Sequence, residues 1–317
     1  MRFGRVQLDG LPRTAVVAGD ALRVLGADVD VLELLQADPA ACERLAALVE
    51  AEYEIGDLPL LAPLVPATIR DFSVFERHVE GVVRNADPQA SVPAAWYESP
   101  FCYFSNPHAL TGPDEAIPVP PGCVDLDFEL EVAAIIGRSG RDLTPTQAAA
   151  HIAGYTIFND WSARDLQIAE MRLGLGPCKG KDFANTLGPW IVTADELEHM
   201  RVGDRLDVAL RAERNGRPVG SDTLASMAWS FEELIAYASR GTWVRPGDVL
   251  GSGTCGGGCL LELWGRHGRE GLPPLGPGDV MSLHVEGIGT LTNTVVAGRE
   301  PVALPSAATS RSTRPGS

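Results

Sequence analysis

Residues 126–132 read Leu-Asp-Phe-Glu-Leu-Glu-Val, an alternation of apolar and acidic side chains, and Asp160 follows 29 residues after Glu131. Side chains alternate between the faces of a strand, so Asp127, Glu129 and Glu131 should share one face. Carboxylates on one face raise each other's pKa unless a cation neutralises them, and hard oxygen ligands suit Mg²⁺, Mn²⁺ or Ca²⁺ better than zinc. The stretch predicts either a divalent-cation site or an edge strand with a solvated acidic face.

The composition is that of a globular protein with a large core. The chain has 317 residues, of which 45% are hydrophobic, and its 26 Lys+Arg against 42 Asp+Glu give a net charge of −16. That charge argues against a nucleic-acid partner or an anionic membrane surface. No apolar run reaches the roughly 18 residues of a membrane span, and the first ten residues lack the apolar core of a secretion signal. We therefore expect a soluble, cytoplasmic protein without nucleic-acid or membrane partners.

Glycine-rich and cysteine-bearing segments offer weaker signals. Gly180-Lys181 is not a P-loop, because position 175 is Leu and Asp182 replaces the required Ser or Thr. Residues 251–256 match the GxGxxG pattern, but the β-like run 259–264 follows where a helix should open, so no nucleotide cofactor is expected. The six cysteines have no CxxC spacing and are expected to be reduced thiols, without a complete soft-metal site.

The chain divides by composition into three parts. Residues 1–65 contain a helical stretch near 31–51 and predict a small N-terminal α/β domain. Residues 66–298 predict a mainly β (α+β) domain, because short β-like runs alternate with Gly and Pro, as at 133–136, 190–193, 205–210 and 280–285. Residues 299–317 are rich in Ser, Pro, Arg and Thr and are expected to be a disordered tail.

Two helices are expected to carry polar site residues. Asn159 can cap a helix that begins at Asp160. On this helix a polar stripe would consist of Asp160, Arg164, Gln167 and Met171. A neighbouring apolar stripe would consist of Ala163, Leu166, Ala169 and Leu173. Such a polar stripe faces either solvent or a site with donors for an oxyanion. Ser73 to Glu76 has capping-box spacing, which predicts a helix from Ser73 with Asp71 in the preceding loop and His78 in an early turn.

Several short motifs follow one another along residues 66–298. They are Asp71-Phe72 with His78, the segments 126–131, 159–167, 252–254 and 261–263, and Gly180-Lys181. In order and spacing, this set resembles the fumarylacetoacetate hydrolase family. That broad family includes β-diketone and acylpyruvate hydrolases, hydroxy-dienedioate isomerases and decarboxylases, and oxaloacetate decarboxylases. The resemblance implies a mixed β-sheet roll, a homodimer, a divalent cation with Mg²⁺ favoured, and no organic cofactor.

The resemblance also implies roles for individual residues. The cation ligands would be Asp71, Glu129, Glu131 and Asp160, with Asp127 outside the first shell, although the alternation alone had treated Asp127 as an equal. His78 would activate water and Glu262 would orient it. Oxyanion and carbanion would be stabilised by Arg164, Gln167 and Lys181, and Thr254 would bind substrate.

Substrate-binding positions depart from the animal enzymes. Ser73 and Met171 stand where those enzymes have tyrosines, and Tyr103 is a candidate for a third such tyrosine. Fewer hydroxyl donors argue against fumarylacetoacetate itself and favour a smaller or less polar acylpyruvate-like substrate.

Three functions follow as hypotheses. The first is a metal-dependent hydrolase that cleaves a carbon–carbon bond in a small-molecule 1,3-diketo acid. The second uses the same site as an oxaloacetate or 2-oxo acid decarboxylase or as a hydroxy-dienedioate isomerase, for which His78 need not activate water. The third, favoured least, is a non-catalytic metal-binding protein.

Overall fold

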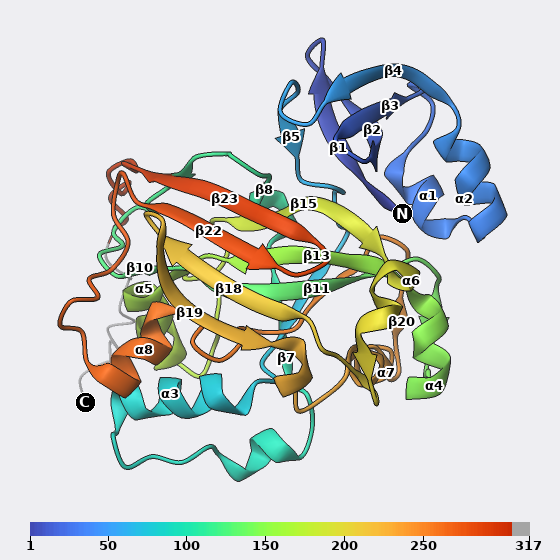
Figure 1. Ribbon diagram of the computed structural model, residues 1–317. Helices are drawn as coiled ribbons and strands as arrows, with labels where there is room; N and C mark the ends of the chain where they lie inside the picture. The colour runs from blue at the N-terminus through green and yellow to red at the C-terminus, as the bar shows by residue number, and fades with distance from the viewer. Residues whose placement is uncertain (306–317) are drawn as a thin grey trace, which may run out of the picture.

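The computed structural model describes residues 1–305 as a mixed α+β fold rich in strands, as the sequence predicts (Figure 1). A 12-stranded sheet has ten strands in the order β4-β3-β2-β1-β15-β13-β11-β21-β6-β7, with β5 paired to β1 and β8 to β15. Its strands are β1 (Arg2–Leu8), β2 (Leu11–Ala18), β3 (Ala21–Leu25), β4 (Val49–Glu54), β5 (Leu60–Leu61), β6 (Ile69–Phe72), β7 (Cys102–Ser105), β8 (Leu110–Thr111), β11 (Leu130–Ile136), β13 (Ile152–Asp160), β15 (Asn185–Thr193) and β21 (Val249–Gly251).

A second, five-stranded sheet lies across the middle of the first (Figure 1). It runs in the order β19-β18-β22-β23-β9, where the strands are β9 (Ile117–Pro118), β18 (Ala209–Arg214), β19 (Arg217–Thr223), β22 (Val280–Val285) and β23 (Gly289–Val296). The remaining strands form short pairs: β10 (Leu126–Asp127) with β14 (Ser162–Ala163), β12 (Gly140–Arg141) with β20 (Trp243–Val244), and β16 (Arg201–Val202) with β17 (Arg205–Leu206).

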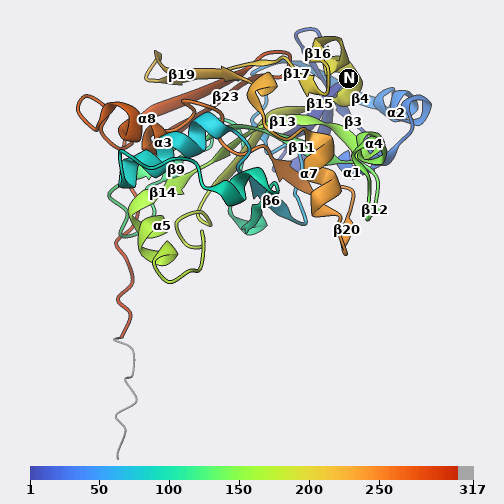
Figure 2. The same cartoon turned by 90° about the horizontal axis from the view of Figure 1, so that it is seen from below.

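Helices cover the edges of these sheets. They are α1 (Val31–Gln36), α2 (Pro39–Ala46), α3 (Glu76–Ala86), α4 (Pro145–Ala148), α5 (Arg164–Met171), α6 (Ala194–Leu197), α7 (Phe231–Ala238) and α8 (Leu260–His267). Figure 2 shows α3 and α8 side by side, and their glycines explain the close approach, since a side chain at Gly81 or Gly265 would collide with the facing helix. None of the helices in residues 1–305 has the length and apolar character needed to cross a bilayer.

Strand β11 is buried on both of its faces. Val132, Ala134 and Ile136 belong to the core that includes the second sheet, whereas Ala133 and Ile135 pack into a core shared with the N-terminal strands and helices. A strand buried on both faces is a run of apolar residues rather than an alternation. The acidic residues at its start therefore enter a dry environment.

The regular elements differ from the sequence expectations in places. The runs 133–136, 190–193 and 280–285 are strands, as predicted. The stretch 31–51 contains α1, α2 and the first residues of β4 instead of one helix, and the run 205–210 is broken between β17 and β18. Residues 299–305 are exposed and form no helix or strand, while the rest of the predicted tail lies outside the described residues.

The division at residue 65 stays a prediction. It falls between β5 and β6, but the sheet itself is continuous across the two parts, because β1 pairs with β15 at Arg2↔Val192. Figure 1 shows β1–β5 with α1 and α2 grouped at one side of the molecule.

Candidate active site

Four carboxylates from neighbouring strands meet at one end of the central sheet. They are Asp71 on β6, Glu129 just before β11, Glu131 on β11 and Asp160 at the end of β13, with exposed fractions of 1%, 4%, 0% and 0%. Oxygen atoms of Asp71, Glu129 and Glu131 all lie within 4.8 Å of one another. The alternative of an edge strand with a solvated acidic face is therefore wrong, because β11 lies in the sheet interior between β13 and β21.

Lys181 links Asp160 to this cluster. Its buried Nζ lies 2.5 Å from Glu129 Oε2 and 2.6 Å from Asp160 Oδ2. Burial opposes the charged form of the amine, but the two carboxylates more than offset that effect and raise its pKa. Lys181 thus stands in the site as a cation.

Tyr103 was expected to contact substrate, and the structure places its hydroxyl between two carboxylates. The hydroxyl donates to Asp71 Oδ2 at 2.7 Å and is also within hydrogen-bond distance of Asp160 Oδ2. Burial, followed by the surrounding carboxylates, raises the pKa of the phenol well above its usual value. Tyr103 is therefore a neutral donor to the acidic cluster, a contact that no local motif predicts.

The electrostatics of the cluster fit a bound cation. Burial raises the pKa of Asp71 although the hydrogen bond with Glu131 and the charge of Lys181 oppose it, and burial raises the pKa of Asp160 to about 7 against the charge of Lys181. Burial first, and then the neighbouring carboxylates, raise the pKa of Glu131. Burial acts in the same direction on Glu129, but Lys181, Arg164 and His78 outweigh it, so the pKa of Glu129 is lowered. Asp160 Oδ1 is buried and has no hydrogen-bond partner among residues 1–305. An orphaned carboxylate oxygen beside repelling carboxylates suits a hard divalent ion.

Backbone at residues 251–254 approaches the cluster closely. Gly253 N donates to Asp71 Oδ1 at 3.2 Å and to Glu131 Oε2 at 3.1 Å, and its φ of +76° favours glycine. A side chain at Gly251 would collide with Asp71. Thr254, expected to bind substrate, lies with its hydroxyl 3.3 Å from Glu131 Oε1.

His78 and Glu262 form a pair between α3 and α8. His78 Nδ1 lies 3.5 Å from Glu262 Oε2, and Glu262 is held in turn by Arg266 Nε at 2.9 Å and Gly257 N at 2.7 Å. Burial opposes ionisation of Glu262, but the hydrogen bonds from His78, Arg266 and Gly257 lower its pKa. The carboxylate can therefore accept from Nδ1–H and leave Nε2 free to accept a proton.

Glu129 connects this pair to the acidic cluster. A ring nitrogen of His78, a Glu129 oxygen and Cys259 Sγ lie within 4.8 Å of one another. The Sγ atom of Cys259 lies 3.7 Å from His78 Nδ1. No sequence motif predicted this contact.

Asp127 has a structural position away from the acidic cluster. Its carboxylate accepts from Leu260 N at 2.8 Å and Leu261 N at 3.0 Å, and from Arg164 Nε at 2.8 Å. It therefore caps α8, which begins where the sequence indicated a β-like run at 259–264. The reason given against a nucleotide at 251–256 was wrong, because a helix does open there, but the carboxylate occupies the helix end that a phosphate would need.

The segment after Asp160 also differs from expectation. Asp160 ends β13 and α5 begins at Arg164, because Asn159 Oδ1 accepts from Glu129 N at 2.9 Å instead of capping a helix. Of the predicted apolar stripe only Ala163 is buried, and Leu173 is 77% exposed. Met171 on the polar stripe is 53% exposed.

Arg164 and Gln167 still lie together at the site. Arg164 Nη2 donates to Glu129 Oε1 at 2.7 Å and Nη1 donates to Gln167 Oε1 at 3.0 Å. Because its oxygen accepts from Arg164, the amide nitrogen of Gln167 remains a donor. Gly180 packs against Gln167, where a side chain would collide with it.

The expected capping box at Ser73 is absent. Helix α3 begins at Glu76 with Phe75 as its N-cap and no side-chain cap, and Asp71 lies in β6 instead of a loop. Glu76 accepts from Tyr97 OH at 2.5 Å, and the carbonyl of Ser73 accepts from Trp96 Nε1 at 2.6 Å. The partners that displaced the box come from residues 20 or more positions away, which local spacing does not reveal.

Known proteins with similar sequences or folds belong to one enzyme family. Residues 68–296 match the family model described as "Fumarylacetoacetate (FAA) hydrolase C-terminal". The fumarylacetoacetase of Arabidopsis thaliana is 29% identical over 67% of this chain and 61% of its own length. The mitochondrial oxaloacetate tautomerase of Homo sapiens is 32% identical over 63% of this chain and 60% of its own length. These alignments thus span about three-fifths of both curated relatives.

A solved structure covers most of this chain. The 5-carboxymethyl-2-hydroxymuconate delta-isomerase from Mycobacterium smegmatis is 27% identical, with a TM-score of 0.70 over 94% of this chain and 100% of that one. The similar proteins therefore carry the names of a hydrolase, a tautomerase and an isomerase.

Proposed function

The chain belongs to the fumarylacetoacetate hydrolase family, and on that premise we propose that it is a divalent-metal-dependent hydrolase of 1,3-diketo acids. The substrate would be of the fumarylacetoacetate or acylpyruvate type, and one carbon–carbon bond would be cleaved. The observation that carries the proposal is the position of Glu129. Its carboxylate lies within 4.8 Å both of oxygens of Asp71 and Glu131 and of a ring nitrogen of His78, so cation and base would act on one molecule.

The cation would be held by the four carboxylates of the cluster, namely Asp71, Glu129, Glu131 and Asp160. All donors are hard oxygens, which favours Mg²⁺ and also admits Mn²⁺ or Ca²⁺. When bound, such an ion withdraws electron density from the substrate oxygens and so weakens the bond to be broken. No organic cofactor is required for this chemistry.

His78 and Glu262 would generate the nucleophile. Nε2 of His78 takes a proton from water while Glu262 holds the Nδ1–H. The water oxygen adds to the distal carbonyl carbon, and the carbon–carbon bond then breaks with its electron pair retained by the leaving carbon. A proton delivered to that carbon completes the hydrolysis, and Lys181 is the nearest buried ammonium to the cluster.

Gln167 and Lys181 would stabilise negative charge directly, and Arg164 would position its neighbours. Lys181 and the free amide N–H of Gln167 are the donors for the oxyanion. The guanidinium of Arg164 already contacts Asp127, Glu129 and Gln167, so we assign it to holding Glu129 and Gln167 in place.

Substrate contacts would come from Ser73, Tyr103, Met171 and Thr254. The hydroxyls of Tyr103 and Thr254 are engaged by the acidic cluster, and Met171 offers an apolar contact. Such a lining favours a small acylpyruvate over fumarylacetoacetate. The resemblance adds a homodimer to the proposal, and the sequence features discussed above add a cytoplasmic location.

A second candidate is proton transfer or decarboxylation at the same site, as in an oxaloacetate tautomerase, hydroxy-dienedioate isomerase or 2-oxo acid decarboxylase. The naming of a 32% identical relative as an oxaloacetate tautomerase favours it. Such a reaction needs the cation and Lys181, but it does not need His78 to activate water.

The two candidates are separated by their products. Loss of enol absorbance would be followed for fumarylacetoacetate, fumarylpyruvate, acetylpyruvate and oxaloacetate, with Mg²⁺ or Mn²⁺ and with EDTA. Two carbon fragments from a diketo acid support the hydrolase. An isomer, or CO₂ from oxaloacetate alone, supports the second candidate, and no turnover across the panel with retained metal binding would overturn both.

A further inference from the structure

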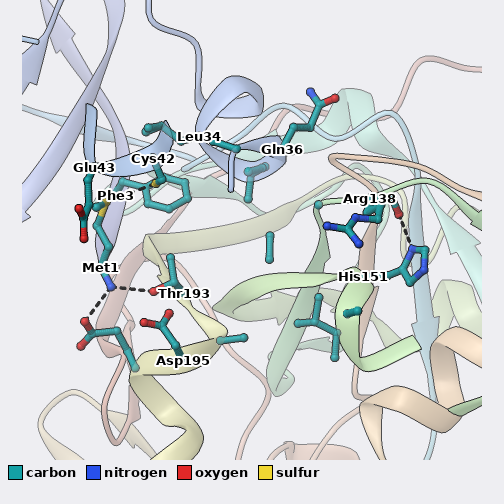
Figure 3. A pocket seen from close by; sticks show the side chains of 18 residues that line it. Met1, Phe3, Leu34, Gln36, Cys42, Glu43, Arg138, His151, Thr193 and Asp195 are labelled. Carbon is teal, nitrogen blue, oxygen red and sulfur yellow. Dashed lines mark hydrogen bonds and ion pairs between the residues drawn. The ribbon is translucent and has the colours of Figure 1, made fainter. Parts of the chain in front are cut away.

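A cavity lies away from the carboxylate cluster, at the other end of the same strands. Figure 3 shows the side chains that line it. It has a volume of about 660 Å³ and lies where β1, α1 and α2 meet the end of β11, the start of β13 and the end of β15. Asp160 lies at the opposite end of the nine-residue strand β13, about 26 Å away at roughly 3.3 Å per residue. None of the candidate active-site residues lines this cavity.

One side of the cavity presents Arg138, whose guanidinium is a cation, and His151. In Figure 3 the guanidinium of Arg138 points toward the middle of the cavity. It makes no ion pair with any carboxylate of residues 1–305. His151 Nδ1 lies 2.9 Å from the carbonyl oxygen of Arg138, so the imidazole N–H holds the backbone of Arg138. This side suits a carboxylate.

The other side presents acids. Asp195 and Glu43 have no cationic partner in the described part of the chain, whereas Glu196 is paired with the amino group of Met1 at 2.7 Å. With Arg138 at one side and two free carboxylates at the other, a simple anion would be repelled by the acids, and a simple amine would leave Arg138 unpaired. A ligand that carries both charges satisfies both sides.

The wall between these charges is apolar. Met1, Ile152 and Ala153 line the cavity and are half-buried, whereas the lining residues Phe3, Leu34 and Leu35 belong to the buried core. Small-molecule sites commonly enclose about 300–1,000 Å³ and combine such walls with a few polar groups. The cavity falls within that range and has both kinds of lining.

We propose that this cavity is a second ligand site, which takes a zwitterion of dipeptide size with apolar side chains. Its carboxylate lies against Arg138, its ammonium against Asp195 and Glu43, and its side chains against Met1, Ile152 and Ala153. The site is independent of the proposed hydrolase activity, since it shares no residue with it.

Calorimetric titration of the full chain with the dipeptide leucyl-phenylalanine tests the proposal. We expect saturable binding of one molecule per chain. Its N-acetylated amide, which lacks both charges, should bind at least tenfold more weakly, and so should the dipeptide to Arg138→Glu. The matched control is Arg217→Glu, which reverses an exposed arginine on β19 that makes no ion pair within residues 1–305, and its affinity should equal that of the original chain.

Three outcomes would overturn the proposal. They are no saturable binding of the dipeptide, equal binding of the uncharged derivative, and unchanged affinity in Arg138→Glu. Because Arg138 is exposed, its substitution should leave the fold intact, so loss of binding is not explained by unfolding.

Discussion

The two ends of β11, β13 and β15 use charge in opposite ways. At one end Asp71, Glu129, Glu131 and Asp160 are almost fully buried, and Lys181 and Arg164 neutralise part of their charge. At the other end Arg138 and Asp195 are exposed and have no ionic partner among residues 1–305. Buried charges are costly unless they are paired, so they persist where chemistry uses them. Exposed charges cost little free energy of folding, so they can remain unpaired until a ligand binds.

The largest effect on metal binding and activity is expected when a proposed cation ligand is changed. Glu131→Gln should lower Mg²⁺ or Mn²⁺ affinity more than about 100-fold, because even groups that only support a metal ligand are worth about 10- to 100-fold. Cleavage should fall with it. Calorimetry measures the affinity, and circular dichroism checks the fold.

That variant should remain folded. Burial and neighbouring carboxylates raise the pKa of Glu131 well above its usual value, so its neutral form resembles glutamine in shape and charge. Undiminished metal binding in a folded Glu131→Gln would remove Glu131 from the ligand set.

The next largest effect should come from His78. His78→Ala should slow hydrolysis by about 10²- to 10⁴-fold, the usual contribution of a general base. Metal affinity should change less than about threefold, because His78 is not among the proposed ligands. Hydrolysis at the original rate would show that another group activates water.

The free energy of unfolding should also depend more on the buried charges than on the exposed ones. Asp127→Asn removes the charge opposite buried Arg164 and weakens the cap of α8, so the free energy of unfolding should fall by about 3–5 kcal/mol. Urea unfolding measures this loss. A change below about 1 kcal/mol, as an exposed charge gives, would show that the network is not needed for the fold.

A smaller effect is expected at Gln167. Gln167→Ala removes one oxyanion donor, which is worth about 10²- to 10³-fold in kcat at most. KM should change less than kcat, since the donor acts on charge that develops during the reaction. Steady-state kinetics on the best substrate separates the two, and an effect on KM alone would place Gln167 in ground-state binding.

At the opposite end of the strands the smallest effect is expected. Arg138→Glu should leave kcat and KM for the diketo acid unchanged, and the free energy of unfolding should change by about 0.5 kcal/mol or less. Kinetics and urea unfolding of the same preparation test both. A large loss of either would mean that the two ends are not separate.

Part of the acidic cluster could be predicted from the sequence because that part is marked by a local pattern. Alternation at 126–132 brought Glu129 and Glu131 together, and the resemblance supplied Asp71, Asp160 and the pair of His78 with Glu262. Asp127 was grouped with them by alternation, whereas contacts with α8 and Arg164 draw it away. Alternation predicts on which face of a strand a side chain lies, but it does not predict which residues that side chain contacts.

Non-local contacts explain the other differences. Asn159 and Asp160 looked like a helix start, but Asn159 bonds to the backbone of Glu129 across the sheet. The run 259–264 looked β-like, yet Asp127 caps it as a helix from more than 130 positions away. Tyr103 reaches the cluster because it pairs with Asp71 across β6 and β7. The cavity near Arg138 likewise forms from segments scattered along the chain, so no motif marks it.

The most direct test of the proposed hydrolase identifies the products formed from acetylpyruvate by the Mg²⁺-loaded protein, using NMR. We expect acetate and pyruvate in equal amounts, and neither after EDTA treatment. Formation of an isomer or CO₂ in place of the two fragments, or cleavage that persists without a cation, would contradict a metal-dependent carbon–carbon hydrolase at this site.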